Sequence, residues 1–437
     1  MDLAILIPQF GNLLFTIIAF IVALSVIVTI HELGHYFVGR WSGIKSDVFS
    51  LGFGPVLFSR RDRHGTIWQV AALPLGGYVK FRGDANAASG KDEGALSTMD
   101  AQARRETMHG APLWARAATA AAGPVANFIL SALVFSAFLL FSGVASDPLT
   151  VARVLPMPGV QELEAGDEIL SIAGQPTPEL AEFGSYIDTL PPERMLDYTV
   201  LRDGREISLR APHPMPPLAV GISPDSAAIS ARMRSGDVIL SIDGTELETF
   251  SQLRDIVGAS DGAPMALRVW RAGEVIDLTL EPRRRDVPLP GGGFETRWLI
   301  GLSGGFFFEP ATEAPGIWDV ATYGVKKTGE IIRSSLSGLY HMIIGSISSC
   351  NLSGPIGIAE TSGAMASQGI SSFIWFIAVL STAVGLLNLF PIPVLDGGHL
   401  VFYAYEAVTR RQPSERAYRI LMTMGLAVIL SLMALGL

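Results

Sequence analysis

The stretch "LAILIPQFGNLLFTIIAFIVALSVIVTIHELGH" (residues 3–35) decides the fold, because an apolar run long enough to cross a membrane ends in three ionisable side chains. Residues 3–30 contain no Asp, Glu, Lys or Arg, and about 20 apolar residues cross the hydrocarbon core as a helix. A secretory signal peptide is the simplest alternative. No Lys or Arg precedes Arg40, however, and the run leads into the histidines instead of a small-residue cleavage site. The stretch therefore predicts a retained transmembrane helix.

Three further blocks lack charged residues over at least 18 positions: 117–146, 361–395 and 420–437. The block 361–395 is longer than a span requires. With 49% hydrophobic and 17% charged residues, the composition excludes an ordinary soluble protein. We predict a polytopic α-helical membrane protein with four transmembrane helices. The predicted segments are 1–46, 111–146, 361–400 and 420–437, with a cytoplasmic loop at 401–419.

The charge distribution predicts the orientation in the membrane. Residues 40–116 carry 11 Lys and Arg against 7 Asp and Glu, whereas residues 143–370 carry 17 against 29. Under the positive-inside rule the basic loops face the cytoplasm, and the acidic segment and both termini lie outside. The formal net charge of -9 therefore belongs to an exported segment, which argues against nucleic acid as a partner. The single cysteine, Cys350, excludes an internal disulfide.

The acidic segment contains a repeat. "AGDEILSIAGQPTPELAEF" (165–183) aligns with "SGDVILSIDGTELETFSQL" (235–253), and each copy continues into two alternating runs around an Asp-Gly or Ala-Gly turn, the pattern of a β-hairpin. The arrangement resembles the PDZ domains of bacterial proteases, which bind extended peptides at a sheet edge. We predict two tandem PDZ-like α+β domains, 147–214 and 215–285, and then an exported linker with an amphipathic segment, 286–360. A generic β-rich sandwich is the alternative.

The loop after the first span, residues 47–110, predicts a β-hairpin that dips into the membrane. Its arms, 47–60 and 65–81, are apolar, rich in β-branched and aromatic residues, and separated by a polar turn. Non-helical backbone at membrane depth must be satisfied by protein or by a water-filled cavity. An unpaired edge here could receive a substrate strand. Residues 84–110 are polar, and we expect a mobile linker, with a loop over the active-site entrance as the alternative.

The residues His31-Glu32-Leu33-Gly34-His35 fit the pattern H-E-x-x-H. Positions i and i+4 share one face of a helix, so His31 and His35 can bind one Zn²⁺ at ~2.0–2.1 Å. Glu32 would then act as general base on the attacking water. Each ionisable group in a span costs ~2.5–3.5 kcal/mol, so three of them need a compensating partner. A structural pair of hydrogen-bonded histidines is the alternative.

Asp396 is the candidate third ligand, since a catalytic zinc takes three protein ligands and keeps one open position. It lies in "NLFPIPVLDGGH" (388–399), where two prolines break the helix and two glycines let backbone approach a ligand closely. A lone carboxylate at the end of a span is too costly to be idle. His399 is a rival ligand.

These motifs together resemble the site-2 protease family of intramembrane metalloproteases, and the two PDZ-like copies resemble its bacterial RseP-like branch. The motifs are HELGH (31–35), GPVANF (123–128), the repeat pair, NLSGP (351–355) and NLFPIPVLDGGH (388–399). The likeness covers nearly the whole chain. It implies a zinc ion bound by His31, His35 and Asp396, with Glu32 as the catalytic base.

The resemblance also implies substrate contacts. It assigns Asn388 to the substrate or transition state, with a helix-packing hydrogen bond as the alternative. Asn127 and Asn351 are weaker candidates of the same kind. The segment 68–72 of the hairpin would hold the substrate as an added strand, which makes Trp68, Val70 and Ala72 candidate contacts.

The implied function is a zinc-dependent endopeptidase that cleaves transmembrane segments of single-span proteins in the bacterial inner membrane. Family members cut substrates already shortened by an upstream site-1-type protease, such as anti-sigma factors, or cut remnant signal peptides. The zinc site would lie toward the cytoplasmic half of the bilayer and the PDZ-like pair in the periplasm, as a size filter or as a reader of new C-termini. A noncatalytic scaffold that presents the PDZ-like domains is the alternative.

Overall fold

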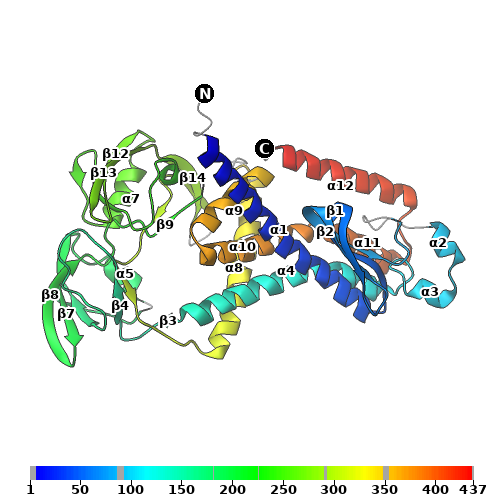
Figure 1. Cartoon of the computed structure of the whole chain (residues 1–437), viewed down its shortest axis with the longest axis horizontal. Helices are drawn as coiled ribbons and strands as arrows, with labels where there is room; N and C mark the ends of the chain where they lie inside the picture. The colour runs from blue at the N-terminus through cyan, green and yellow to red at the C-terminus, as the bar shows by residue number, and fades with distance from the viewer. Residues whose placement is uncertain are drawn as a thin grey trace. The chain divides into compact units, whose positions relative to one another are not determined.

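The computed structural model describes residues 6–85, 93–180, 182–224, 226–289, 293–347 and 354–435, and it contains two compact units (Figure 1). Unit 1 comprises Met1–Ala137, Val320–Leu339 and Ser349–Leu437 and holds the apolar helices. Unit 2 comprises Phe138–Asp319 and Tyr340–Ser348 and holds the two repeat domains.

Three helices in the described residues are long and apolar enough to cross a membrane. They are Leu13–Trp41 of α1 (Leu6–Trp41), α4 (Leu113–Ser142) and α10 (Ile370–Asn388). The first two predicted spans are thereby supported by helices of sufficient length. The predicted fourth span corresponds to α12 (Glu415–Leu435), which is not among the three.

The third predicted span, 361–395, is divided in the structure. Its first residues belong to α9 (Pro355–Ser367), and α10 begins only after a break at Gly369, whose φ is +116°. A glycine adopts this backbone conformation without steric cost, and the turn ends α9. α9 packs on α1, where a methyl group at Gly363 would come within 2.3 Å of Thr16 Oγ1. Charge-free composition alone does not reveal such a break.

The predicted hairpin is confirmed as β1 (Ser46–Arg61) and β2 (Ile67–Phe81), which lie beside the second half of α1 (Figure 1). Both strands bend, so that the first part of β1 pairs with two parts of β2. Phe49, for example, has Val79 on one side and Trp68 on the other. The sheet covers a small core with α1, whose buried members include Tyr36 and Phe49.

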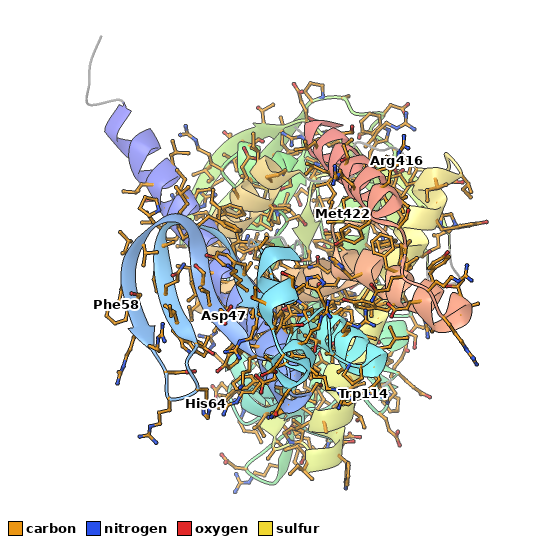
Figure 2. The ribbon with its side chains drawn as sticks, turned by 90° about the vertical axis from the view of Figure 1, so that its right-hand side faces the viewer. Asp47, Phe58, His64, Trp114, Arg416 and Met422 are labelled. Atoms are coloured by element: carbon orange, nitrogen blue, oxygen red, sulfur yellow. The ribbon has the colours of Figure 1, made fainter. Side chains whose placement is uncertain are left out.

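The bent end of the hairpin presents apolar side chains to its surroundings. Leu57 is 71% exposed and Phe58 65%, and Figure 2 shows Phe58 pointing outward from the sheet. At the opposite end, the Asp62 carboxylate accepts hydrogen bonds from the Tyr36 hydroxyl and Trp68 Nε1. Burial raises the pKa of Asp62, but these bonds and two from backbone N–H groups bring it below its usual value.

The predicted mobile linker, 84–110, is partly helical. It contains α2 (Glu93–Thr98) and α3 (Ala101–Arg105), whose first turn is capped by Asp100. An aspartate N-cap satisfies a backbone N–H that the helix leaves unpaired, so it favours a helix start even in a polar segment.

The repeat in unit 2 is confirmed as two four-stranded sheets of identical strand order. The first has the order β6-β5-β7-β8 and the second β11-β10-β12-β13. The first set is β5 (Glu168–Ile172), β6 (Gln175–Pro176), β7 (Met195–Arg202) and β8 (Arg205–Pro212). The second is β10 (Val238–Ile242), β11 (Thr245–Glu246), β12 (Met265–Arg271) and β13 (Glu274–Leu280). Each sheet has one helix, α5 (Phe183–Ile187) or α7 (Phe250–Gly258).

The Gly-Asp pair of the repeat has the same structural role in both domains. Asp167 is fully buried and accepts two hydrogen bonds of 2.7 Å from Arg202. Asp237 is equally buried and accepts two from Arg271, at 2.7 and 2.6 Å. A buried carboxylate requires such pairing, which explains why the repeat preserves it.

The segment 286–360, predicted as a linker, instead completes both repeat domains. β16 (Leu302–Ser303) pairs with β9 (Gly221–Ile222) of the second domain. β17 (Phe308–Pro310) pairs with β4 (Val151–Val154) of the first domain, and Phe307 and Phe308 are buried in its core. The second domain is thus inserted in the first, and the predicted boundaries 147–214 and 215–285 are too narrow.

The rest of this region contains a hairpin, a short strand pair and a long helix. β14 (Arg283–Pro288) and β15 (Phe294–Leu299) form a hairpin, and β18 (Thr312–Glu313) pairs with β3 (Val144–Ala145). α8 (Ile317–Ile343) then follows as the expected amphipathic segment, and α6 (Ala227–Ser230) is a single turn in the second domain. Pairing between strands about 150 residues apart leaves no local signal in the sequence.

Candidate metal centre

His31 and His35 project from one face of α1 toward Asp396, the first residue of α11 (Asp396–Thr409). His31 Nε2 lies 3.1 Å from His35 Nε2 and 3.1 Å from Asp396 Oδ2, and His35 Nε2 lies 3.4 Å from Asp396 Oδ1. These three residues form the only group of mutually close metal-ligating side chains in the described part of the chain. The structure therefore brings together all three predicted ligands.

The spacing of the donor atoms fits a zinc ion. Tetrahedral zinc bonds of ~2.0–2.1 Å place two ligand atoms about 3.4 Å apart. The three distances, 3.1, 3.1 and 3.4 Å, are close to this value. The side chains are only 11%, 12% and 18% exposed, so their close approach is not a chance surface contact. Two imidazoles and one carboxylate also leave a fourth position open, as a catalytic zinc requires.

α4 holds the two histidines from behind. His35 Nδ1 lies 2.7 Å from the Thr119 carbonyl oxygen, and His31 Nδ1 lies 3.3 Å from Asn127 Nδ2. Gly123 lies between Thr119 and Asn127 on α4, and a methyl group at Gly123 would come within 2.3 Å of His35 Nε2. The glycine is needed because the helix backbone passes directly against the imidazoles.

Asp396 is positioned by the irregular segment that precedes it. α10 ends at Asn388, and α11 begins after a turn that contains Pro391 and Pro393. A methyl group at Gly397 would come within 2.3 Å of the Leu389 carbonyl oxygen, so the start of α11 folds tightly back on this turn. The two prolines and the glycines that the sequence singles out therefore bring the carboxylate to the histidines.

Glu32, the residue after His31 on α1, is held by the hairpin. Its carboxylate accepts a hydrogen bond from the backbone N–H of Val79 in β2. A methyl group at Gly77 would lie 2.8 Å from the Ser50 carbonyl oxygen and 3.0 Å from Val28 Cγ1, so glycine lets this part of the strand lie close to α1 beside Glu32. Glu32 precedes one ligand and does not belong to the group of ligating atoms, which suits a base more than a fourth ligand.

The rival ligand His399 does not join the metal group. It lies one turn along α11 from Asp396, and its ring approaches Phe402 and Tyr418 with centroids 6.4 Å from each. Its position indicates a packing role in the described structure.

The segment 68–72, predicted to hold the substrate as an added strand, lies mostly inside the sheet. Trp68 has Phe49 on one side and Arg60 on the other, and Val70 lies likewise between Leu51 and Phe58. Both residues are therefore inside the sheet and have no free backbone edge. Ala72 follows them at the bend and is exposed.

Two other segments form the edges of the sheet, 56–61 and 77–81, because each pairs on one side only in the described register. Of these, 77–81 is the edge that packs against α1. Val79, in its middle, donates to Glu32. The sequence did not single it out. Its signal is the Gly-Gly pair at 76–77, which permits the close approach to α1.

The three asparagines predicted as substrate contacts lie in different places. Asn127 is fully buried beside His31. Asn388 ends α10, and no hydrogen bond joins it to His31, His35 or Asp396 among the described residues. Asn351 lies outside the described residues, as does Cys350.

Comparison with known proteins shows the family of this chain. A family model described as Peptidase family M50 matches residues 19–432. A protein of Agrobacterium fabrum named "Putative zinc metalloprotease" is 37% identical over 422 residues, which cover 95% of this chain and 93% of the relative. "Regulator of sigma-E protease RseP" of Salmonella typhimurium is 31% identical over 458 residues, which cover 98% of each chain.

Proposed function

The chain belongs to peptidase family M50, the site-2 protease family, and we propose that His31, His35 and Asp396 hold the zinc ion on which this family depends. The protein is a zinc-dependent intramembrane protease. One observation carries the assignment of the ligands, namely three donor atoms from two distant helices within 4.8 Å of one another.

Glu32 is the proposed general base. When bound, zinc supplies a Lewis acid that polarises the scissile carbonyl and makes water more acidic. Glu32 stands next to a ligand, and its carboxylate is oriented by the Val79 N–H. It takes a proton from the attacking water and later delivers it to the leaving amine.

The substrate enters as an extended strand at the edge 77–81. A helical substrate hides its peptide bonds, so it must unwind before cleavage, and an added strand gives the exposed backbone new hydrogen bonds. The edge is supported by its single pairing partner and by the contact of Val79 with Glu32. Ala72, at the bend of the same sheet, and Asn388, eight residues before Asp396, remain candidate contacts.

We assign four transmembrane helices, with α12 as the fourth. Between Arg419 and the end of the described chain α12 carries no charge, and several of its large apolar side chains are exposed. The exposed residues include Ile420, Met424 and Leu430. We propose that both termini and the repeat domains lie in the periplasm and that the zinc site lies toward the cytoplasmic half of the bacterial inner membrane. The charge distribution of the loops supports this orientation.

The proposed substrates are transmembrane segments of single-span proteins. The Salmonella typhimurium relative is named a regulator of sigma-E, which supports substrates of the anti-sigma-factor type, first shortened by a site-1-type protease. Remnant signal peptides have the same chemistry, an apolar helix with a short exported part. The PDZ-like repeat domains then act on the exported part, by excluding long ones or by reading a new C-terminus.

The alternative, a noncatalytic scaffold, leaves the central observation unexplained. A scaffold has no use for a carboxylate and two imidazoles buried together in a bundle of apolar helices, since each costs free energy there. The repeat domains alone would fit a scaffold, but the geometry around Glu32 would not.

The substrate proposal is tested in cells of the native organism. Glu32→Gln protein should bind its substrates without cutting them, so uncut membrane-protein fragments should accumulate relative to wild type and be identifiable by quantitative proteomics. An identical set of fragments in both strains would overturn the proposal.

A further inference from the structure

Asn127 is a fully buried asparagine whose side chain ends beside a predicted zinc ligand. Its Nδ2 lies 3.3 Å from His31 Nδ1, while its Oδ1 is buried and has no hydrogen-bond partner in the described part of the chain. A buried amide oxygen without a partner costs about 1–3 kcal/mol. Both features need an explanation.

The chemistry of imidazole decides which atom of Asn127 must face His31. In a neutral imidazole one ring nitrogen carries a proton and the other carries a lone pair. Because His31 Nε2 faces Asp396 and His35 at the metal centre, Nε2 needs the lone pair and Nδ1 carries the proton. Nδ1 is then a donor, and the group beside it must be an acceptor.

His35 shows the expected pattern. Its Nδ1 lies 2.7 Å from the Thr119 carbonyl oxygen, which can only accept. At His31, an amide nitrogen facing the protonated Nδ1 would place two hydrogen-bond donors against each other. Oxygen and nitrogen of an amide are nearly equal in shape, so a half turn of the amide exchanges them without disturbing the packing. Oδ1 then accepts from His31 Nδ1, and the NH₂ group takes the place of Oδ1.

The surroundings of Asn127 hold it rigidly at this position. The hydroxyl groups of Ser131 and Ser381 each donate to the Asn127 backbone oxygen at 3.0 Å. All three residues are fully buried, and Gly385 of α10 packs against the Asn127 side chain. The backbone and Cβ of Asn127 are thus held where α4 packs against α10.

We propose that Asn127 is a positioning residue that accepts the Nδ1 proton of His31 and thereby fixes His31 as a zinc ligand. The inference rests on the proposed zinc centre, and it assigns Asn127 a role other than the substrate contact expected from the sequence. Partners that orient a ligating histidine typically contribute a factor of ~10–100 to metal affinity.

The test is the zinc affinity of the purified full-length protein, measured by competition with a chromophoric chelator. Asn127→Leu, of similar size but without an acceptor, should bind zinc about 10–100 times more weakly. Asn127→Asp, which can only accept, should bind zinc at least as tightly as wild type. Asn388→Leu, the matched control from the other predicted contact, should leave zinc affinity unchanged.

Two results would overturn the proposal. The first is wild-type zinc affinity in Asn127→Leu together with lower kcat/KM, which is the signature of a substrate contact. The second is weaker zinc binding in Asn127→Asp, which means that the amide donates to His31. The aspartate variant keeps the test decisive if the leucine variant does not fold. Unchanged zinc binding in His31→Ala would instead refute the zinc centre itself.

Discussion

Arg116 of α4 and Glu406 of α11 form a bidentate ion pair, with Arg116 Nη2 2.7 Å from Glu406 Oε1 and Nη1 3.0 Å from Oε2. Arg116 Nε also donates to the Ala111 carbonyl oxygen, and its guanidinium lies 5.2 Å from the centre of the Tyr403 ring. The Arg116 side chain is only 9% exposed. The pair joins the helix that contacts both histidines to the helix that begins with Asp396.

Replacing Arg116 by Leu should therefore destabilise the protein by about 3 kcal/mol, because the Glu406 carboxylate is left unpaired in a poorly solvated place. Arg116→Leu combined with Glu406→Leu should recover most of this loss, since no charge is then left buried. Thermal unfolding of the detergent-solubilised protein measures both. A double variant as unstable as the single one would show that the pairing is not the cause.

Gly123→Ala should abolish zinc binding while the helices still form. The added methyl group would lie 2.3 Å from His35 Nε2, so the ligand must move by about 1 Å, and such a displacement can cost ~100-fold in activity. Gly329→Ala in α8 is the matched control, because no atom outside its chain neighbours and the adjacent helix backbone lies within 4 Å of the added methyl group. Metal analysis and a protease assay report the outcome. Normal zinc content in Gly123→Ala would contradict the packing described for α4.

Asp167→Asn should destabilise the first repeat domain at neutral pH by about 2 kcal/mol, the usual contribution of hydrogen bonds to a charged group. Burial raises the pKa of Asp167, but hydrogen bonds from Arg202 and the Glu164 N–H bring it below its usual value. The stabilisation is therefore present above the unfolded-state pKa of ~3.9 and is lost as the pH falls toward the folded-state value.

Hydrogen exchange of β7 amides at several pH values measures this effect. The difference between wild type and Asp167→Asn should shrink below about pH 4. Asp197 lies in β7 itself, and its side chain is 82% exposed. Asp197→Asn should therefore have little effect on β7 exchange at any pH. A difference that persists unchanged into acid would mean that the charge of Asp167 is not involved.

Removing both repeat domains should relax substrate selection if they exclude long exported segments. The strand pairing offers a clean junction, because Ala145 and Thr312 are register partners. Deleting residues 146–311 removes both domains together with the strands that complete them. The shortened protease should cleave a substrate that has not been trimmed by another protease. Unchanged selectivity would refute the size filter, whereas loss of cleavage of already shortened substrates would favour recognition of a new C-terminus.

The local parts of the site could be predicted from sequence, and its distant contacts could not. His31 and His35 follow from helical periodicity, and Asp396 follows from the cost of a lone carboxylate at the end of a span. The break at Gly369, the strands between residues 300 and 313 and the contact of Val79 with Glu32 depend on partners far away in the chain. A pattern within ten residues carries no information about such partners.

The same reason explains the misplaced substrate edge. Composition indicated that residues 68–72 form a strand, but which side of a strand is free depends on the whole sheet. β1 bends at glycines such as Gly52 and Gly54, both with positive φ. The bend brings its second part, 56–61, against residues 67–71. The edges of the sheet are consequently residues 56–61 and 77–81.

The most direct test of the zinc centre is the zinc content and zinc X-ray absorption spectrum of the purified full-length protein. We predict one zinc per chain, with two imidazole nitrogens and oxygen ligands at ~2.0–2.2 Å. Glu32→Gln should keep this spectrum and lose proteolysis, while the double variant His31→Ala, His35→Ala should lose the metal. Full zinc content in the double variant, or full proteolysis by Glu32→Gln, would contradict the assignment.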